Sequence, residues 1–203
     1  MIPSGLRVYL ASRSLRRREL LRQIGVSYEV LVLRERAERG TDVDESMRPG
    51  ESAEDYVRRV CADKVAAGWR AVVQRKYFRH PVLAADTAVC LGDTIFGKPR
   101  DRQDAERMLA ALAGREHRVL TAVALQSGEW MELALSESFV TIRALAKAEI
   151  AAYLDTGEAA DKAGAYAIQG KAAAFIAALR GSYSGVMGLP LYETAMLIER
   201  LRE

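Results

Sequence analysis

The sequence predicts an α/β protein built on a mixed β-sheet. Short aliphatic runs typical of strands alternate with longer segments whose apolar residues recur at helical spacing. Some predicted strands are separated by a helix, which suits parallel pairing, whereas others follow one another across a short turn, which suits antiparallel pairing. No internal repeat, low-complexity tract or proline-rich linker divides the 203 residues. We therefore expect one domain, residues 1–203, with room for a substantial core.

Two strands and two helices are expected before residue 75. The predicted strands are 6–11 and 28–33, and the predicted helices are 15–24 and 51–73. Ser14 is a candidate N-cap of the first helix, and Gly25 is a stop signal after it. Residues 34–50 are polar and show no period, which predicts a long loop of the kind that often has a functional role.

The stretch LAADTAVCLGDTIFGKP, residues 83–99, predicts a hairpin with a carboxylate near its root. A buried strand is expected to end at Asp86, the apolar pattern resumes at Ala88, and Gly92 begins a turn to a second strand. An ionised aspartate inside a strand is costly unless a cation or a hydrogen-bond donor meets it. Asp86 is therefore either paired structurally or placed at a cleft where a metal or substrate pairs it.

The second half is expected to alternate in the same way. Asp101 opens a helix that Gly114 closes, and strands 117–125 and 131–142 are expected to pair antiparallel across a turn at Ser127. The remaining expected elements are helices 146–155 and 191–200 and short strands 166–169 and 173–179.

Charge and cysteine usage favour a cytoplasmic enzyme or binding protein. The formal net charge is +3, and the basic residues are scattered except for a run at 16–18. This pattern, without a groove-reading motif, argues against nucleic acid as a partner but suits a small anionic substrate. Cys61 and Cys90 lie in apolar contexts without metal-ligand spacing, as expected for reduced thiols. No run is long and apolar enough to suggest a membrane partner or a signal peptide.

The segment SRSLRRR, residues 12–18, is the first candidate site. The hydroxyls of Ser12 and Ser14 and the N–H groups of a helix start could bind an anion, and Arg16 or Arg17 could fork onto phosphate oxygens. The alternative is that Ser14 only caps the helix and the arginines face solvent. No P-loop sequence is present.

Three further features could contribute to a site. In DKAGAYAIQG, residues 161–170, Asp161 and Lys162 form an exposed charged pair, and the Gln169 amide could read a base edge or simply bond a loop backbone. The stretch GSYSGVMGLP, residues 181–190, could wrap a phosphate or merely turn. His80 and His117 lack ligand spacing and are interpreted as structural or surface residues.

Four segments in order resemble the Maf family of nucleoside triphosphate pyrophosphatases. They are LASRSLRRRELL, AADTAVCLGDTIFGKPRD, DKAGAYAIQG and GSYSGVMGLPLYET, and they span nearly the whole chain. The resemblance implies an elongated mixed β-sheet flanked by helices, with two lobes around a central cleft, as in inosine triphosphatase-like folds. It also implies cleavage of a nucleoside triphosphate between its α- and β-phosphates, a divalent metal cation that is usually Mg²⁺, and a homodimer.

The resemblance assigns roles to positions of this chain. Asp86 matches the acidic residue that accepts the proton of the attacking water, and Glu45 in the DVDE segment matches a loop carboxylate, so both are candidate metal ligands. Lys64 and Lys98 match two catalytic-site lysines. Residues tied to substrate binding are Ser12, Arg16, Thr87 and Gln169. Two departures are visible, since Leu15 replaces a usual proline and the loop 34–45 is longer than in many relatives.

The two key dipeptides indicate a branch within the family. Asp86-Thr87 and Ile168-Gln169 before a glycine resemble the branch that prefers dTTP and UTP. The branch that prefers 7-methyl-GTP typically has Asp-Gln and a glutamate instead. The alternatives that remain open are a 7-methyl-GTP pyrophosphatase and a non-enzymatic regulator of septum formation.

Overall fold

A single mixed sheet of seven strands organises the chain. The computed structural model describes residues 5–34 and 42–201. The strand order is β2-β1-β3-β5-β6-β7, with β4 paired to β3 beside this path. Pairing is parallel between β1 and β2 and between β1 and β3, and antiparallel for the other pairs. The strands are β1 (Arg7–Leu10), β2 (Ser27–Val30), β3 (Val82–Leu91), β4 (Thr94–Phe96), β5 (Glu116–Ser127), β6 (Trp130–Ile142) and β7 (Ile176–Arg180). The predicted mixed sheet is confirmed.

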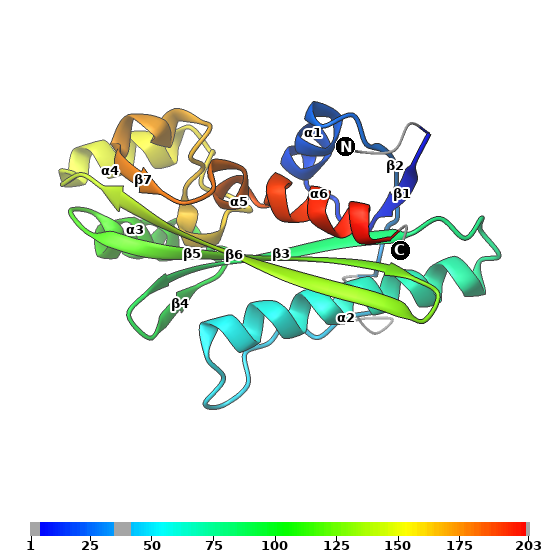
Figure 1. Cartoon of the computed structure of the whole chain (residues 1–203). Coiled ribbons are helices and arrows are strands. Elements are labelled where there is room, and N and C mark those ends of the chain that lie inside the picture. Colours follow the sequence, from blue (N-terminus) through cyan, green and yellow to red (C-terminus); the bar gives the residue numbers. More distant parts are fainter. Residues whose placement is uncertain (1–4, 35–41, 202–203) are drawn as a thin grey trace.

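The three long strands β3, β5 and β6 run the length of the molecule and connect two lobes (Figure 1). One lobe gathers β1, β2, α1, α2 and α6, and the other gathers β4, β7, α3 and α4. The helices are α1 (Leu15–Gln23), α2 (Ala53–Gln74), α3 (Arg102–Leu112), α4 (Lys147–Asp155), α5 (Tyr183–Met187) and α6 (Leu191–Arg200). Two 3₁₀ turns, η2 (Ala163–Ala165) and η3 (Lys171–Phe175), precede β7. No helix within 5–34 and 42–201 is long and apolar enough to cross a membrane.

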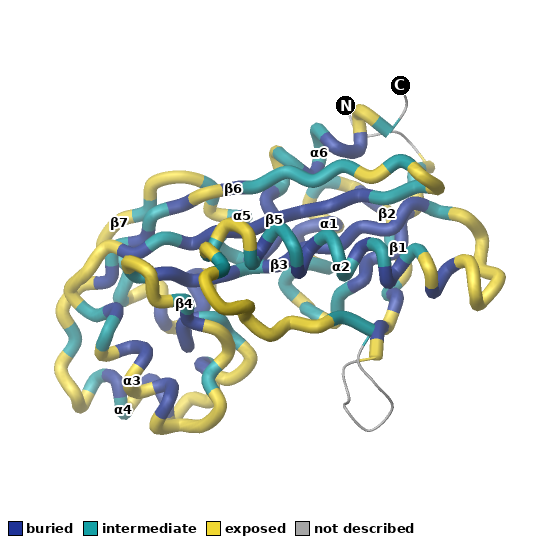
Figure 2. Tube along the Cα trace, turned by 90° about the horizontal axis from the view of Figure 1, so that it is seen from below, coloured by how far each residue is buried: buried dark blue, intermediate teal, exposed yellow. Residues whose placement is uncertain are grey.

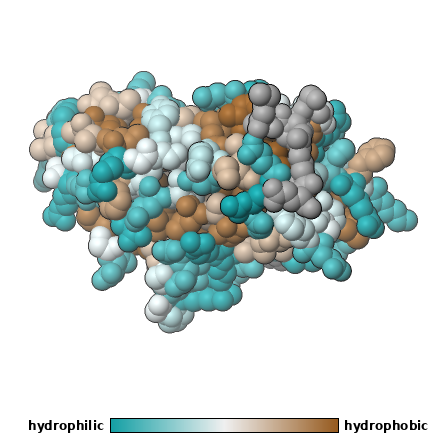
Figure 3. All heavy atoms as spheres, in the orientation of Figure 1, coloured by the Kyte–Doolittle hydropathy of each residue, from teal (hydrophilic) through white to brown (hydrophobic). Residues whose placement is uncertain are grey.

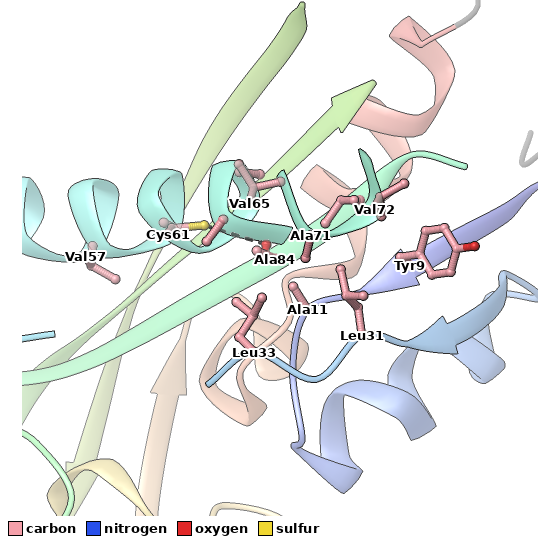
Figure 4. Close-up of a cluster of buried hydrophobic side chains, with 14 of the residues drawn as sticks. Tyr9, Ala11, Leu31, Leu33, Val57, Cys61, Val65, Ala71, Val72 and Ala84 are labelled. Carbon is pink, nitrogen blue, oxygen red and sulfur yellow. Dashed lines mark hydrogen bonds between the residues drawn. The ribbon is translucent and has the colours of Figure 1, made fainter. Parts of the chain in front are cut away.

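Helix α2 covers one face of the sheet because its apolar residues recur every three or four positions. Val57, Cys61 and Val65 face the sheet together with Ala84 of β3 and Leu31 of the segment after β2 (Figure 4). At position 68 a glycine is required, because a Cβ atom there would lie 2.7 Å from a methyl group of Val82. This close approach fixes α2 against β3 and sets where its polar residues meet the strand.

The opposite face packs against α1 and α6, and the second lobe has its own apolar cluster around α3 and α4. Figure 2 shows that the central strands are buried along most of their length, whereas exposed residues concentrate in the loops. On the face shown in Figure 3, hydrophobic residues occur in several separate groups among hydrophilic ones.

The helix boundaries follow the capping signals of the sequence. The Ser14 side chain accepts a hydrogen bond from the backbone N–H of Arg17 at the start of α1, as predicted. Asp101 caps α3 in the same way through the N–H of Asp104. Helix α2 begins two residues later than predicted, because Ser52 is its N-cap.

Four sequence predictions of secondary structure are wrong. Strand β3 does not end at Asp86, because its ladder with β5 continues from Val82 to Cys90. Residues 166–169 do not form a strand: they follow η2, where Ala165 has a positive φ of 62°, and Ile168 and Gln169 lie in a turn. The strand predicted at 173–179 starts only with β7, after η3, and the predicted loop 181–190 contains the short helix α5.

Candidate active site

A gap in the sheet creates the cleft between the lobes. Along one edge of β3, β1 pairs with Val82 and Leu83, and β4 pairs with residues from Val89 onward. Between these pairings, residues 84–88 have a partner strand only on their other side, where β5 lies, within the part of the chain that the structure describes. Asp86 and Thr87 lie in the middle of this open edge, and their side chains leave the strand toward opposite faces.

The cleft has a volume of about 800 Å³. Its walls come from the start of α1, from α2, from the middle of β3, from the segment after β4 and from residues 161–169. The structure brings together all eight residues that the sequence singled out, which are Ser12, Arg16, Glu45, Lys64, Asp86, Thr87, Lys98 and Gln169. Their roles in binding and catalysis stay predictions.

Lys64 joins two carboxylates at the centre of the cleft. Its Nζ lies 2.7 Å from Oδ1 of Asp86 and 2.9 Å from Oε1 of Glu45. The Asp86 side chain is only 10% exposed and that of Lys64 14%, whereas that of Glu45 is 46% exposed. Burial alone would lower the pKa of Lys64, but the two carboxylates outweigh it and raise the pKa above its ordinary value. Asp86 therefore combines both sequence alternatives, because it is paired and also lies at the cleft.

The donor set at this point suits a hard divalent cation. Mg²⁺ is commonly held by one or two carboxylates and completes its shell with water and phosphate oxygens. Asp86 and Glu45 supply two carboxylates that already converge on one positive charge. In residues 5–34 and 42–201, no group of three or more His, Cys, Asp or Glu side chains is arranged to hold a metal. A metal that shares its shell with a bound phosphate fits these residues.

Arg17 is anchored in the wall of the cleft, whereas the sequence prediction favoured Arg16. The Nε of Arg17 donates to the carbonyl oxygen of Gly188 (2.7 Å), and its terminal nitrogens donate to Ser12 Oγ (3.2 Å) and Thr87 Oγ1 (3.4 Å). Burial lowers the pKa of Arg17, and the nearby Asp86 carboxylate partly opposes this effect. The sequence had offered Arg17 as an alternative, but nothing local revealed a partner 171 positions away.

Arg16, Lys98 and Lys162 form a second group of cations along the cleft. The side chains of Arg16 and Lys98 make no hydrogen bond or ion pair with another described residue. Lys162 was predicted to form an exposed pair with Asp161, but it is partly buried and donates to the carbonyl oxygen of Ala160 (3.1 Å). Burial, then Arg16, and more weakly Lys98, lower the pKa of Lys162. This concentration of positive charge suits a polyanionic ligand.

Hydrogen bonds to Glu158 fix the backbone that follows Gln169. The carboxylate of Glu158 accepts hydrogen bonds from the backbone N–H groups of Lys171 (2.8 Å) and Ala172 (3.2 Å). Gly170 lies close beside it, because a Cβ atom there would meet the Glu158 carboxylate. The amide of Gln169 itself is exposed and has no hydrogen-bond partner among the described residues, so it is available to a ligand.

His117 supports the same wall from the core, in agreement with its structural interpretation. It is 2% exposed, and its Nε2 lies 2.8 Å from the hydroxyl of Tyr166. Burial lowers the pKa of His117 to about 4, so the ring is neutral at pH 7. His80 lies near the surface and contacts the rings of Tyr9 and Phe78.

Comparisons with known proteins agree with the resemblance found in the sequence. The sequence pattern of the family described as Maf-like protein matches residues 7–201. A dTTP/UTP pyrophosphatase of Nitrosomonas europaea is 54% identical over 97% of this chain and 95% of its own length. Proteins of the same name from Cupriavidus pinatubonensis and Aromatoleum aromaticum are 53% and 54% identical, over 96% and 98% of this chain and 96% and 97% of their own lengths.

A comparison with solved structures gave the following match. The Ham1 protein of Staphylococcus aureus superposes with a TM-score of 0.45 at 15% identity, over 67% of this chain and 71% of its own. The family assignment rests on the match over residues 7–201 and on the relatives above 50% identity. The chain belongs to the Maf-like protein family.

Proposed function

We propose that this protein hydrolyses dTTP and UTP to the nucleoside monophosphate and pyrophosphate. The observation that carries the proposal is the cluster of Asp86, Lys64 and Glu45 at the open edge of β3, with further cations around it. Relatives above 50% identity over nearly the full chain are named dTTP/UTP pyrophosphatases, which supports the same substrates here.

Arg16, Lys98 and Lys162 bind the triphosphate. Arg16 and Lys98 have no ion-pair partner among the described residues, so each can meet a phosphate oxygen without first breaking a contact. Lys162 is also held within reach of the cleft. Charges placed where negative charge grows on the leaving pyrophosphate lower the barrier to its departure. We assign Arg16, Lys98 and Lys162 to this role.

Asp86 accepts the proton of the attacking water. The water oxygen forms a bond to the α-phosphorus, the bond from this phosphorus to the bridging oxygen breaks, and pyrophosphate leaves with that oxygen. Lys64 Nζ lies 2.7 Å from Oδ1 of Asp86 and keeps this carboxylate oriented. Asp86 and Glu45 would hold a divalent cation such as Mg²⁺, which would neutralise charge on the phosphate oxygens.

The base is recognised at the other end of the cleft by Gln169 and Thr87. An amide offers one donor and one acceptor, which matches the adjacent carbonyl and N–H of the imide edge of uracil and thymine. Guanine presents two adjacent donors on the corresponding edge, which a carboxylate would bind better. A site built to pair polar groups rejects a base that leaves them unpaired.

We also propose that the protein acts as a homodimer in the cytoplasm. The resemblance to the Maf family implies a homodimer. The two cysteines, Cys61 and Cys90, are free buried thiols, which suits a reducing compartment. Sedimentation of the purified protein at micromolar concentration tests the first statement, because a monomer there would exclude the dimer.

The products formed from UTP in the presence of Mg²⁺ test the reaction. The proposal predicts UMP and pyrophosphate in equal amounts, with no UDP or orthophosphate. Formation of UDP and orthophosphate would place the cleavage at the wrong bond. If no nucleotide is turned over, a non-enzymatic role such as regulation of septum formation takes its place.

A further inference from the structure

Two threonines on neighbouring strands form a hydrogen-bonded chain behind the cleft. Thr121 of β5 lies directly opposite Thr87 of β3 in the antiparallel ladder. Its Oγ1 is 3.0 Å from Oγ1 of Thr87 and 2.8 Å from the carbonyl oxygen of Gly185 in α5. The Thr121 side chain is fully buried, so bulk water does not reach it to complete its hydrogen bonds.

Counting hydrogens fixes the direction of this chain. A threonine hydroxyl has one hydrogen to donate, and a carbonyl oxygen has none. Two oxygen atoms 2.8 Å apart without a hydrogen between them repel, so Thr121 must donate to Gly185. The 3.0 Å contact between the hydroxyls then holds a hydrogen only if Thr87 donates to Thr121. The single hydrogen of Thr87 is therefore used inside the protein.

Arg17 agrees with this direction from the other side. A terminal nitrogen of its guanidinium, which can only donate, lies 3.4 Å from Thr87 Oγ1. The chain thus runs from Arg17 to Thr87, then to Thr121, and ends at the carbonyl oxygen of Gly185. What the Thr87 oxygen can still offer to the cleft is a lone pair, because its hydrogen is engaged.

We infer that Thr121 makes Thr87 a fixed hydrogen-bond acceptor, and that this acceptor selects the N3–H of uracil or thymine over the bare N3 of cytosine. The inference rests on the proposed function, because it assigns Thr87 to the base of a pyrimidine nucleotide. Phosphate oxygens cannot use this position, since they only accept. Sugar hydroxyls can donate or accept and would not be discriminated by it. Thr121 is a positioning residue, because it acts through Thr87 rather than on the substrate.

Thr121→Val tests the inference with little change of shape. Valine lacks the oxygen that receives the Thr87 hydrogen, so the Thr87 hydroxyl becomes free to rotate and to donate to cytosine N3. Gly185 keeps one partner, because its carbonyl oxygen also accepts from the N–H of Gly188 at 2.9 Å. Thr121→Ser retains the hydroxyl and serves as the rescue variant. Thr194→Val is the matched control, because it removes another fully buried hydroxyl that donates to a backbone carbonyl, that of Pro190.

The measurement is the ratio of kcat/KM for UTP to kcat/KM for CTP. The ratio should fall about tenfold in Thr121→Val, within the range expected for one unpaired polar group, and mainly through a gain on CTP. Thr121→Ser and Thr194→Val should keep the wild-type ratio. Structural damage alone would lower both rates together, so an unchanged ratio in Thr121→Val overturns the inference.

Neutron diffraction of the unliganded protein after deuterium exchange tests the direction without any turnover. We expect the deuterium between the two threonines to be bonded to Thr87, and that of Thr121 to point to Gly185. A deuterium bonded to Thr121 and directed at Thr87 would overturn the inference. A map with the expected direction, together with no hydrolysis of any nucleotide, would instead reject the proposed function and leave the hydrogen assignment in place.

Discussion

Replacing Asp86 with asparagine separates catalysis from folding at the centre of the cleft. The substitution keeps the size of the side chain but removes the charge that lies 2.7 Å from Lys64 Nζ. The asparagine oxygen can still accept from Lys64, which also keeps Glu45 at 2.9 Å. We therefore expect a stability loss of about 1–3 kcal/mol, as for one weakened buried hydrogen bond, and a folded protein.

Turnover should fall much further than stability. A positioned general base contributes about 100- to 10,000-fold to a rate, and an amide cannot accept the proton of water. Initial rates of pyrophosphate release from UTP, measured beside thermal melting curves, give both quantities on one preparation. Asp86→Asn retaining more than about a tenth of the wild-type rate would show that Asp86 is a structural residue.

Asp104→Asn is the matched control for this experiment. Asp104 is also a buried carboxylate in ion pairs, with Arg107 at 2.8 Å and Arg100 at 3.3 Å, but it lies on α3 outside the cleft. The Asp104→Asn variant should be less stable than the wild type but should release pyrophosphate at close to the wild-type rate. If Asp104→Asn lost as much activity as Asp86→Asn, general destabilisation would explain both and the assignment of the base would fail.

Three further substitutions test other parts of the cleft and the core. Gln169→Glu should erode the preference for UTP over GTP by at least about fivefold in kcat/KM, because a carboxylate repels the imide carbonyls; an unchanged ratio would remove Gln169 from base recognition. Lys98→Met should lower kcat/KM for UTP by about 100-fold. The melting temperature should not shift, since Lys98 has no ion-pair partner among the described residues. Lys147→Met, at an exposed position on α4, should change neither kcat/KM nor the melting temperature. His117→Phe should reduce the loss of stability on acidification. Burial lowers the pKa of His117 from 6.5 to about 4, so on acidification the unfolded chain binds a proton at this residue before the folded chain does. The difference corresponds to about 3 kcal/mol of unfolding free energy, which is present above pH 6.5 and is lost as the pH falls toward 4. Urea unfolding at pH 7 and pH 4.5 checks this, and equal pH dependence in wild type and variant would contradict it.

Local signals predicted helices α1, α2, α3, α4 and α6 and the long strands β5 and β6 well. Ser14 and Asp101 cap α1 and α3 because a short polar side chain at the N-cap satisfies a free backbone N–H, whatever the rest of the fold does. The pairing of β5 with β6 needs only a two-residue turn, so neighbours in sequence become neighbours in the sheet. Such features depend on a few adjacent residues.

Features that depend on distant contacts escaped prediction. An aspartate in mid-strand was interpreted as a strand end, but β3 continues because β5 pairs with it and Lys64, 22 positions away, neutralises Asp86. The turn at 161–170 is shaped by the packing of Gly164, where a Cβ atom would lie 3.0 Å from Val89. The preference for Arg17 over Arg16 as the anchored residue depends on Gly188 at the far end of the chain.

Resemblance supplied what local patterns could not. Residue chemistry alone left Asp86 as either a structural ion pair or a cleft residue, and left Gln169 open between a base contact and a loop contact. The family resemblance placed Glu45, Lys64 and Lys98 in one site, and the structure shows that these three line the same cleft as Asp86. Residues far apart in the sequence meet in one cleft because of the topology of the whole chain, which a single segment does not encode.

A competition assay among five nucleotides measures the substrate preference of the protein in a single experiment. The wild-type protein receives equal concentrations of dTTP, UTP, CTP, GTP and 7-methyl-GTP in one tube with Mg²⁺, and chromatography follows the loss of each triphosphate and the appearance of its monophosphate. Relative rates of loss then give the ratios of kcat/KM without separate experiments. We expect dTTP and UTP to disappear at least about fivefold faster than the other three and to yield their monophosphates. Faster loss of 7-methyl-GTP, or equal loss of all five, would contradict it.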